Sequence, residues 1–267
     1  MGKELALIGC GNMGSAIARG VVRAGLIAPE GIVVSDAVAA AAERLAGELG
    51  CTGTCDNAAA VKGAAMVLIA VKPQYLDDVV RGFAAAVAPG AVVVSIAAGV
   101  TIARLEGLLA EGTKVVRIMP NLAAQVGEGM ASVSPNALVS ADELARVVEL
   151  FESFGKAEVV PERLIDAVVA VSGSAPAYVC LFIEAMADAA VAEGMPRAQA
   201  YAFAEQAVRG TATYLQETGT HPAVLKDMVC SPGGTTIEAV AALESGGFRA
   251  TVMDAMRVCA QRNRDMA

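Results

Sequence analysis

The sequence of 267 residues contains no tryptophan, one histidine and only 4% aromatic residues. Charged residues are also scarce, at 18% against about 25% in an average soluble protein. Apolar residues nevertheless reach 55%, so Ala, Val, Ile, Leu and Met must supply the excess. This composition excludes a disordered chain and predicts a large buried fraction, part of it between subunits. At about 150 residues per domain, the length predicts two domains.

Positive charge is in deficit, because 20 Lys and Arg stand against 28 Asp and Glu, which gives a net charge of −8. Binding to nucleic acid or to an anionic membrane requires clustered basic side chains, and the sequence has no such cluster. We therefore expect a small-molecule ligand and neither nucleic acid nor membrane as a partner. An anionic ligand would have to be held by backbone amides or by one well-placed cation.

Metal ligands and export signals are also missing from the sequence. Six cysteines occur without a Cys-x-x-Cys pair, and His221 is the single histidine, so no metal site is expected. His221 precedes Pro222 and is expected to cap a helix or lie on the surface. No secretory segment precedes the first apolar run, which predicts reduced cysteines and a cytoplasmic protein. The uncharged run over residues 167–183 contains Ser, Gly and Pro, which favours a buried core helix over a membrane span.

Two patterns follow each other along the chain. Up to about residue 160, short Val- and Ile-rich runs alternate with segments of helical periodicity, which predicts an α/β domain with a doubly wound parallel sheet over residues 1–160. After Pro161 only helical periodicity remains, which predicts an all-helical domain over residues 161–267 that packs against a copy of itself. The expected strands are 5–8, 32–35, 66–71, 92–96, 115–118, 131–134 and 158–160, and the expected helices include 15–24, 36–49, 138–154, 164–194, 196–216, 235–244 and 248–264.

A glycine motif follows the first predicted strand and opens a predicted helix, as a Rossmann-type dinucleotide site requires. Its first glycine would permit a tight turn, its second the approach of a pyrophosphate, and its third close packing of helix and strand. Free amides at the helix start would hold the phosphates in a protein with little positive charge. The motif consists of Gly9, Cys10, Gly11, Asn12, Met13 and Gly14.

A carboxylate ends the second predicted strand, about 20 residues beyond the glycine motif. Asp36, next to Ser35, stands where NAD sites use an acidic side chain to bind the adenosine ribose and repel a 2′-phosphate. Asp36 therefore favours NADH over NADPH. The same residue could also serve as the N-cap of the helix that follows.

Two later strands end in loops that belong to the same crevice. Ligands of open α/β sheets bind beyond the carboxyl ends of the strands, so these loops are expected to flank the nicotinamide half of the cofactor. Lys72 would contact a phosphate or the substrate, or would simply be a solvated loop lysine. The loop residues are Ala70, Val71, Lys72 and Pro73 after one strand and Ala97 and Ala98 after the next.

A second motif, Ser-Pro-Gly-Gly-Thr-Thr-Ile-Glu, covers residues 231–238 in the helical half. Thr235 and Glu238 fit a capping box, which predicts a helix from about Thr236 after a Pro-Gly-Gly turn. The amides at this helix start could hold a carboxylate without any arginine. From the residues alone, an ordinary joint between two helices explains the motif equally well.

With these motifs, the sequence resembles the pyrroline-5-carboxylate reductase family over nearly its whole length. The resemblance implies an NAD(P)H-dependent oxidoreductase that reduces the C=N bond of L-1-pyrroline-5-carboxylate to give L-proline, the last step of proline biosynthesis. It also implies that the C-terminal domain is a dimerisation domain, in a homodimer or a larger ring of dimers. The matching stretches are 8–14, 70–73, 95–101, 171–178 and, most specifically, 225–239.

The resemblance also implies roles for single residues. Thr236 would place its hydroxyl near the ring nitrogen and act in catalysis, while neighbouring amides would hold the substrate carboxylate. Asn57 is implied as an adenosine contact. The implied substrate-binding residues are Glu162, Ser174, Ala175, Ser231, Gly233, Gly234, Thr235 and Thr236.

The sequence departs from the family pattern after Asn121, where Leu122 and Ala123 replace the usual Thr-Pro. Asp36 stands where many members carry Ser or Asn. Two alternatives therefore stay open. One is another imine or β-hydroxyacid dehydrogenase of this architecture, although the lysine typical of its interdomain helix is missing from residues 157–225. The other is a non-catalytic nucleotide-binding regulatory protein, which only Leu122 and Ala123 favour.

Overall fold

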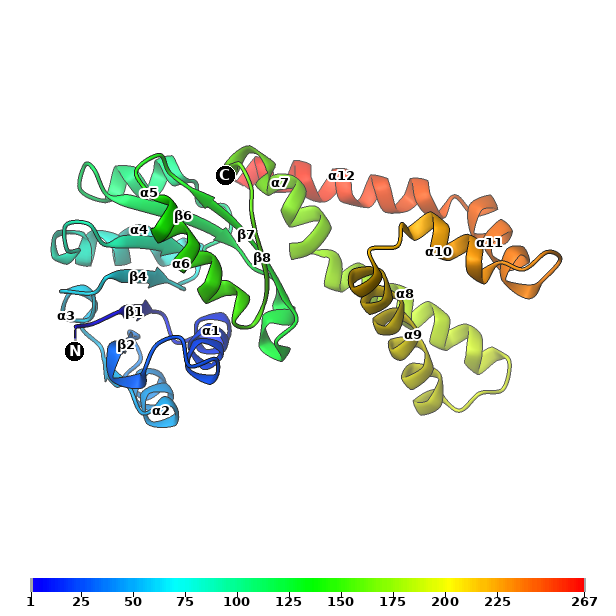
Figure 1. Ribbon diagram of the computed structural model, residues 1–267, viewed down its shortest axis with the longest axis horizontal. Helices are drawn as coiled ribbons and strands as arrows, with labels where there is room; N and C mark the ends of the chain where they lie inside the picture. Colours follow the sequence, from blue (N-terminus) through cyan, green and yellow to red (C-terminus); the bar gives the residue numbers. More distant parts are fainter. Residues whose placement is uncertain (1, 267) are drawn as a thin grey trace. The chain divides into compact units, whose positions relative to one another are not determined.

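The computed structural model describes residues 2–266, and its contacts divide the chain into two compact units (Figure 1). The first unit extends to Gly173 and includes the end of the last helix from Cys259 onwards. The second unit is Ser174–Val258. The domain boundary predicted between residues 160 and 161 lies inside the first unit and stays a prediction, since the helical region sends its last turns back to the first unit.

The first unit is built on an eight-stranded sheet with the order β3-β2-β1-β4-β5-β6-β7-β8 (Figure 1). Neighbouring strands are parallel except β6 and β7, which are antiparallel. This order confirms the predicted doubly wound, Rossmann-type sheet. The strands are β1 (Leu5–Ile8), β2 (Ile32–Ser35), β3 (Thr52–Thr54), β4 (Met66–Ile69), β5 (Val92–Ser95), β6 (Lys114–Met119), β7 (Gly129–Pro135) and β8 (Gly155–Val159).

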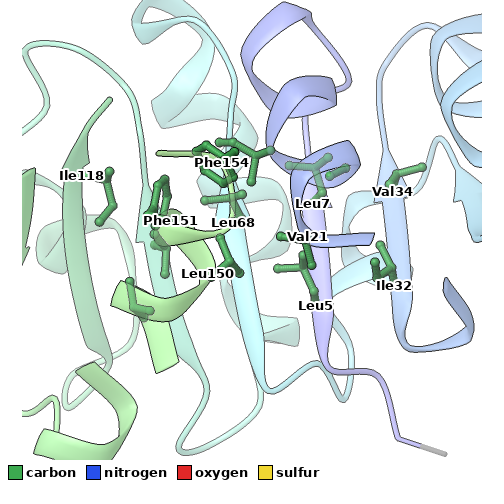
Figure 2. Packing of buried hydrophobic residues seen from close by; sticks show 14 of the residues in the cluster. Leu5, Leu7, Val21, Ile32, Val34, Leu68, Ile118, Leu150, Phe151 and Phe154 are labelled. Atoms are coloured by element: carbon green, nitrogen blue, oxygen red, sulfur yellow. The ribbon is translucent and has the colours of Figure 1, made fainter. Parts of the chain in front are cut away.

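Helices cover both faces of this sheet. Side chains of α1, α2 and α6 form one buried cluster with the strands, while α3, α4 and α5 form a second cluster on the opposite face. Figure 2 shows the first cluster, with Val21 of α1 and Leu150 of α6 packed over the strands near Leu68. Burial from both sides explains the continuous Val and Ile runs of the inner strands. The helices are α1 (Asn12–Arg23), α2 (Ala39–Leu49), α3 (Asn57–Val61), α4 (Pro73–Phe83), α5 (Ile102–Leu108), α6 (Ala141–Glu152) and α7 (Ile165–Val168).

The structure differs from the predicted elements at one short polar strand, in the direction of another strand and within the first long helix. Strand β3 is short and mostly exposed, so the sequence has no apolar run that would predict it. The residues of β7 likewise give no indication that the strand runs antiparallel to β6. The helix predicted over residues 164–194 is interrupted by a π-helical turn, Val169–Gly173. This turn lies directly before α8, and such turns are frequent at functional sites.

The second unit is all-helical in the residues that the structure describes, as predicted. Helix α9 ends at Thr218, its C-cap Gly219 has a left-handed φ of 65°, and α10 follows with His221 as its N-cap. The His221 Nδ1 accepts a hydrogen bond from the Ala223 amide at 3.2 Å, which confirms the predicted capping role. The helices are α8 (Ala175–Ala192), α9 (Arg197–Thr218), α10 (Pro222–Val229), α11 (Thr235–Ser245) and α12 (Phe248–Met266), the last of which returns to the first unit.

Few side chains of the second unit are buried within one chain. In its described residues, Ser174–Val258, only Ala187, Ala200 and Ala204 are buried. The helical run Glu162–Ala192 is long and apolar enough to cross a membrane by length and composition, and 11% of its apolar window is buried. The core burial expected for this helix is therefore not found within a single chain.

Candidate functional site

The glycine motif forms the turn between β1 and α1, and its three glycines meet different surroundings. Gly9 has φ 105°, and a Cβ on it would lie 2.6 Å from the Ala70 carbonyl oxygen. A Cβ on Gly14 would collide with the Gly9 carbonyl oxygen. A Cβ on Gly11 would meet nothing within 4 Å. Gly9 and Gly14 thus serve close packing, while Gly11 leaves open space beside the loop, as a pyrophosphate would require.

Helix α1 begins at Asn12, three residues before the predicted start, so the end of the glycine motif forms the first helical turn. Its N-cap is Gly11, and no side chain caps the turn. A cavity of about 370 Å³ adjoins this loop and is also lined by Arg19, Arg23 and Arg44. Uncapped amides and nearby guanidinium groups suit the phosphates of a dinucleotide.

Asp36 is tied to the glycine motif by a hydrogen bond. Its Oδ2 accepts from the Cys10 amide at 2.8 Å, and its Oδ1 accepts from the Val38 amide at 2.9 Å. Helix α2 begins at Ala39 with Val38 as its N-cap, so the alternative role of Asp36 as N-cap is wrong. The chain bends through residues 37 and 38 before it enters the helix. The carboxylate therefore lies at the carboxyl end of β2, beside the cofactor loop.

Ser35 and Asn57 lie next to this carboxylate. The buried Ser35 hydroxyl donates to Asn57 Oδ1 at 2.7 Å, so the structure brings together three residues predicted to surround the adenosine. Cys10 is buried as well, and burial together with the Asp36 carboxylate raises the pKa of its thiol to about 12. Cys10 thus remains a neutral thiol and is no nucleophile.

The two loops predicted to flank the nicotinamide follow adjacent parallel strands. The Ala70 amide donates to the Ile8 carbonyl oxygen at 2.7 Å, which places the end of β4 against the glycine motif. Lys72 is exposed and is the N-cap of α4, with Pro73 as the first helical residue. In the next loop, Ala97 is buried and Ala98 is exposed. These positions agree with a crevice at the carboxyl edge of the sheet.

Glu162, implied as a substrate contact, is held by two donors of the first unit. Its Oε1 accepts from Arg117 Nη1 at 2.9 Å and from the Ile102 amide at 2.8 Å. The Arg117 side chain is 8% exposed, on a strand that is apolar from Val115 onwards apart from this residue. Sequence reasoning missed Arg117, although one arginine in the apolar run 115–119 is the signal that could have found it.

Asn121 joins the loop after β6 to the π-helical turn. Its Nδ2 donates to Ser172 Oγ at 3.2 Å, and its Oδ1 accepts from the Met130 amide at 3.2 Å. The next residues form a 3₁₀ turn, Leu122–Val126, in which the Leu122 side chain is 59% exposed. Asn121 thus ties this loop both to the π-helical turn and to β7.

In the second unit, the Ser-Pro-Gly-Gly turn begins α11. Gly233 has φ 64°, and the Gly234 amide donates to the Ser231 carbonyl oxygen at 3.0 Å. Gly234 is the N-cap and makes no side-chain cap, so the predicted capping box of Thr235 and Glu238 is wrong. The reason is the extended backbone of Gly234, which takes the N-cap position and moves Thr235 into the helix. The amides of the first turn are therefore not capped by a side chain and remain available to an anion.

The remaining predicted substrate residues lie at helix starts of the same unit. Ser174 is the N-cap of α8, and Ala175 is its first residue. Thr236, the predicted catalytic residue, is partly exposed in the first turn of α11. Among residues 2–266, no group of three or more His, Cys, Asp and Glu side chains could hold a metal ion.

Comparison with known proteins places this arrangement in a family. Residues 162–266 match the family model of pyrroline-5-carboxylate reductase dimerisation, and residues 4–99 match the model of NADP oxidoreductase, coenzyme F420-dependent. Pyrroline-5-carboxylate reductase of Escherichia coli K12 is 48% identical over 100% of this chain and 99% of its own length. The chain belongs to the pyrroline-5-carboxylate reductase family. The Methanosarcina acetivorans enzyme of that name is 42% identical over 99% of this chain and 98% of its own.

Solved structures of the family share the fold over the full length. A pyrroline-5-carboxylate reductase from Coxiella burnetii superposes with a TM-score of 0.96 at 30% identity, covering 100% of this chain and 99% of its own. The Plasmodium falciparum pyrroline carboxylate reductase with NADP bound gives a TM-score of 0.86 at 28% identity, covering 98% and 97%. These matches agree with an NAD(P)H-dependent oxidoreductase of two-part architecture.

Proposed function

We propose that the chain reduces the C=N bond of L-1-pyrroline-5-carboxylate with NAD(P)H to give L-proline, the last step of proline biosynthesis. The observation that carries this proposal is the uncapped start of α11 after the Ser-Pro-Gly-Gly turn, in a chain 48% identical over its full length to a reductase of that name. The turn offers an anion site to the substrate carboxylate without a basic side chain.

The cofactor would lie along the carboxyl edge of the sheet in the first unit and, when bound, supply the hydride. The first turn of α1 would hold its pyrophosphate, and the Ser35–Asn57 pair would border its adenosine. The proposed cofactor residues are Gly9, Cys10, Gly11, Asn12, Met13, Gly14, Ser35, Asp36, Asn57, Ala70, Val71, Lys72, Pro73, Ala97 and Ala98.

Asp36 leads us to propose NADH as the preferred cofactor. Two backbone amides fix its carboxylate at the end of β2, where a ribose hydroxyl can donate to the remaining lone pairs. A 2′-phosphate at that place would meet a negative charge. NADP appears in the description of a matching family model and in the name of a solved relative. It describes those proteins, whose residue at the position of Asp36 need not be acidic.

In the substrate site, Thr236 would hydrogen-bond the ring nitrogen, while amides from Gly233 to Thr236 bind the carboxylate. A protonated imine carbon accepts hydride more readily than a neutral one, so the protein has mainly to orient the ring and hold its nitrogen. The proposed substrate residues are Glu162, Ser174, Ala175, Ser231, Gly233, Gly234, Thr235 and Thr236.

We also propose a cytoplasmic homodimer formed through the helical unit, with a larger ring of dimers as its further assembly. The scarcity of buried residues in Ser174–Val258 supports this, because a unit of that size needs a larger core to be stable. The match of residues 162–266 to a dimerisation model supports the same surface. None of the six cysteines forms a disulfide, as in a reducing compartment.

The test is turnover of the purified chain with pyrroline-5-carboxylate and NADH or NADPH, followed by the absorbance of the reduced cofactor and by detection of L-proline. Oxidation of cofactor with matching formation of proline supports the proposal. Turnover of a β-hydroxyacid or of another imine alone would favour the other dehydrogenases. If no substrate gives a rate above background, the remaining interpretation is a non-catalytic nucleotide-binding regulatory protein.

A further inference from the structure

A buried arginine lies in the sheet and pairs with Glu162, one of the residues proposed above to bind the substrate. Arg117 is on β6, in register with Ser95 of β5 and Ser134 of β7. These three polar residues are each at most 7% exposed and form one row across adjacent strands. A guanidinium in such a place is costly to bury unless it is paired, and here it pairs with the Glu162 carboxylate.

Glu162 transfers this interaction to the start of α5. The same oxygen, Oε1, that pairs with Arg117 also accepts from the Ile102 amide, the first amide of the helix. Glu162 thereby caps the Ile102 amide, just as the Thr101 hydroxyl caps the Arg104 amide by accepting its hydrogen bond at 3.2 Å. Glu162 thus links the start of α5 to Arg117 on β6.

The segment 96–101, which connects β5 to α5, is held at both ends. At its beginning, the Ile96 amide donates to the Ile69 carbonyl oxygen and the Ala97 amide donates to the Ser95 hydroxyl at 3.3 Å. At its end, Glu162 holds Ile102. Between the two anchors the chain reverses through Gly99, with φ 72°. Removal of the second anchor would leave Ala98 and Gly99 free to shift.

We propose that Arg117 is a positioning residue, which acts through Glu162 to hold the segment 96–101 in place against the nicotinamide end of the cofactor. This rests on the proposed function, in which that segment borders the nicotinamide. Hydride transfer is steep in distance, so a small displacement of this segment slows the chemical step more than it weakens substrate binding.

The chain offers a matched control on the same strand. Lys114 begins β6 and pairs with Glu143 of α6, so it makes the same kind of ion pair at the opposite edge of the sheet. Replacement of either cation by methionine removes one charge and one ion pair. Only Arg117→Met removes a partner of Glu162.

The experiment compares Arg117→Met, Arg117→Lys and Lys114→Met with the parent protein. Amide hydrogen exchange of residues 97–102 is measured without cofactor, and kcat, KM and the primary isotope effect of deuterated cofactor are measured in turnover. We expect Arg117→Met to speed exchange at Ile102 by about 10-fold and to lower kcat by about 10-fold, with a larger isotope effect and KM within about threefold. Arg117→Lys should recover part of both losses, and Lys114→Met should leave exchange and kcat as in the parent.

Action through Glu162 has its own readout. In a Glu162→Gln background, Arg117→Met should add less than about twofold to the loss of kcat, since the two residues act as one unit. Parent-like exchange and parent-like kcat in a folded Arg117→Met protein would overturn the proposal, as would full additivity of the two substitutions. If the parent protein does not turn over, the proposed function is overturned. Faster exchange in Arg117→Met than in that parent would still retain the anchoring role, and unchanged exchange in the variant would overturn both proposals.

Discussion

At the scale of single residues, Asp36 combines a structural and a proposed chemical role. The carboxylate bridges the glycine motif and the turn after β2 through two backbone amides, and it stands at the strand end where NAD sites of this fold place a ribose-binding carboxylate. The spacing along the chain predicts its place, whereas its bond to Cys10, 26 residues away, follows only from the sheet.

Replacement of Asp36 by asparagine should shift the cofactor preference towards NADPH. The substitution removes the negative charge that repels a 2′-phosphate, so the ratio of kcat/KM for NADPH to that for NADH should rise about 10-fold, equivalent to about 1.4 kcal/mol. The ratio is the informative quantity, because an amide also loses one backbone hydrogen bond. Glu43→Gln removes an exposed charge from α2 and should leave the ratio unchanged. An NADPH preference in the parent protein would refute the proposed role.

Thr236 gives a second prediction at this scale. Thr236→Ala removes the hydroxyl proposed to hold the ring nitrogen and should lower kcat by about 100-fold. Thr236→Ser keeps the hydroxyl and should stay within a few fold of the parent. Steady-state rates at saturating substrate measure both, and an unchanged kcat in the alanine variant would reduce Thr236 to a spacer.

At the scale of elements, the starts of three helices show how one position changes what a helix end can do. Helix α6 has a full capping box of Ser140 and Glu143, whereas α1 and α11 begin at glycine N-caps with no side-chain cap. Capped amides are satisfied within the protein, and uncapped amides remain free to bind an anion. Helices α2, α4 and α8 also begin without a side-chain cap. Among the uncapped starts, those of α1 and α11, each with a glycine N-cap, are the ones proposed to bind the cofactor and the substrate.

The capping box of α6 predicts a pH dependence of stability. Hydrogen bonds from Lys114 and from the backbone and side chain of Ser140 lower the pKa of Glu143 to about 2, from an ordinary value of 4.5. A lowered pKa means that the stabilisation is present above the unfolded pKa near 4.5 and is lost as the pH falls towards 2. Glu143→Gln should therefore flatten this acid limb in urea midpoints measured against pH. Lys114→Met should flatten it in part, and a limb as steep as in the parent would contradict the assignment.

At the scale of the whole molecule, the two units differ in how much they bury. The first unit encloses two apolar clusters, one on each face of its sheet. In the second unit, Leu181 of α8 and Phe203 of α9 are 66% and 69% exposed within one chain. Apolar surface on this scale is typical of a subunit interface.

The proposed dimer predicts that Leu181→Asp yields a monomer. A charge in the apolar interface should shift the mass in light scattering from dimer or larger to single chain, and should lower the melting temperature and remove its dependence on concentration. Leu138 is 50% exposed in the first unit, so Leu138→Asp is the matched control and should keep the parent mass. A monomeric parent at micromolar concentration would refute the proposed assembly.

Local pattern in the sequence accounts for much of this architecture. The strands predicted at 5–8 and 32–35 are confirmed with the same bounds, and the helical periodicity after residue 161 is confirmed as a helical region. The turns at the glycine motif and at residues 231–234 are also in place. Each depends on residues that are neighbours along the chain, so their order alone determines it.

The tertiary structure decided what depends on distant partners. The exposed strand β3 and the antiparallel direction of β7 depend on the neighbouring strands that pair with them. The predicted N-cap of α11, Thr235, was wrong by one residue, because the extended backbone of Gly234 takes the N-cap position. Glu162 meets Arg117 from 45 residues away and Ile102 from 60, and no local pattern encodes such a pairing. The sequence by itself determined most of the helices and strands and the turns at the two glycine-containing motifs, because these depend on neighbouring residues. Side-chain partners far apart in the chain were fixed by the packing of the sheet.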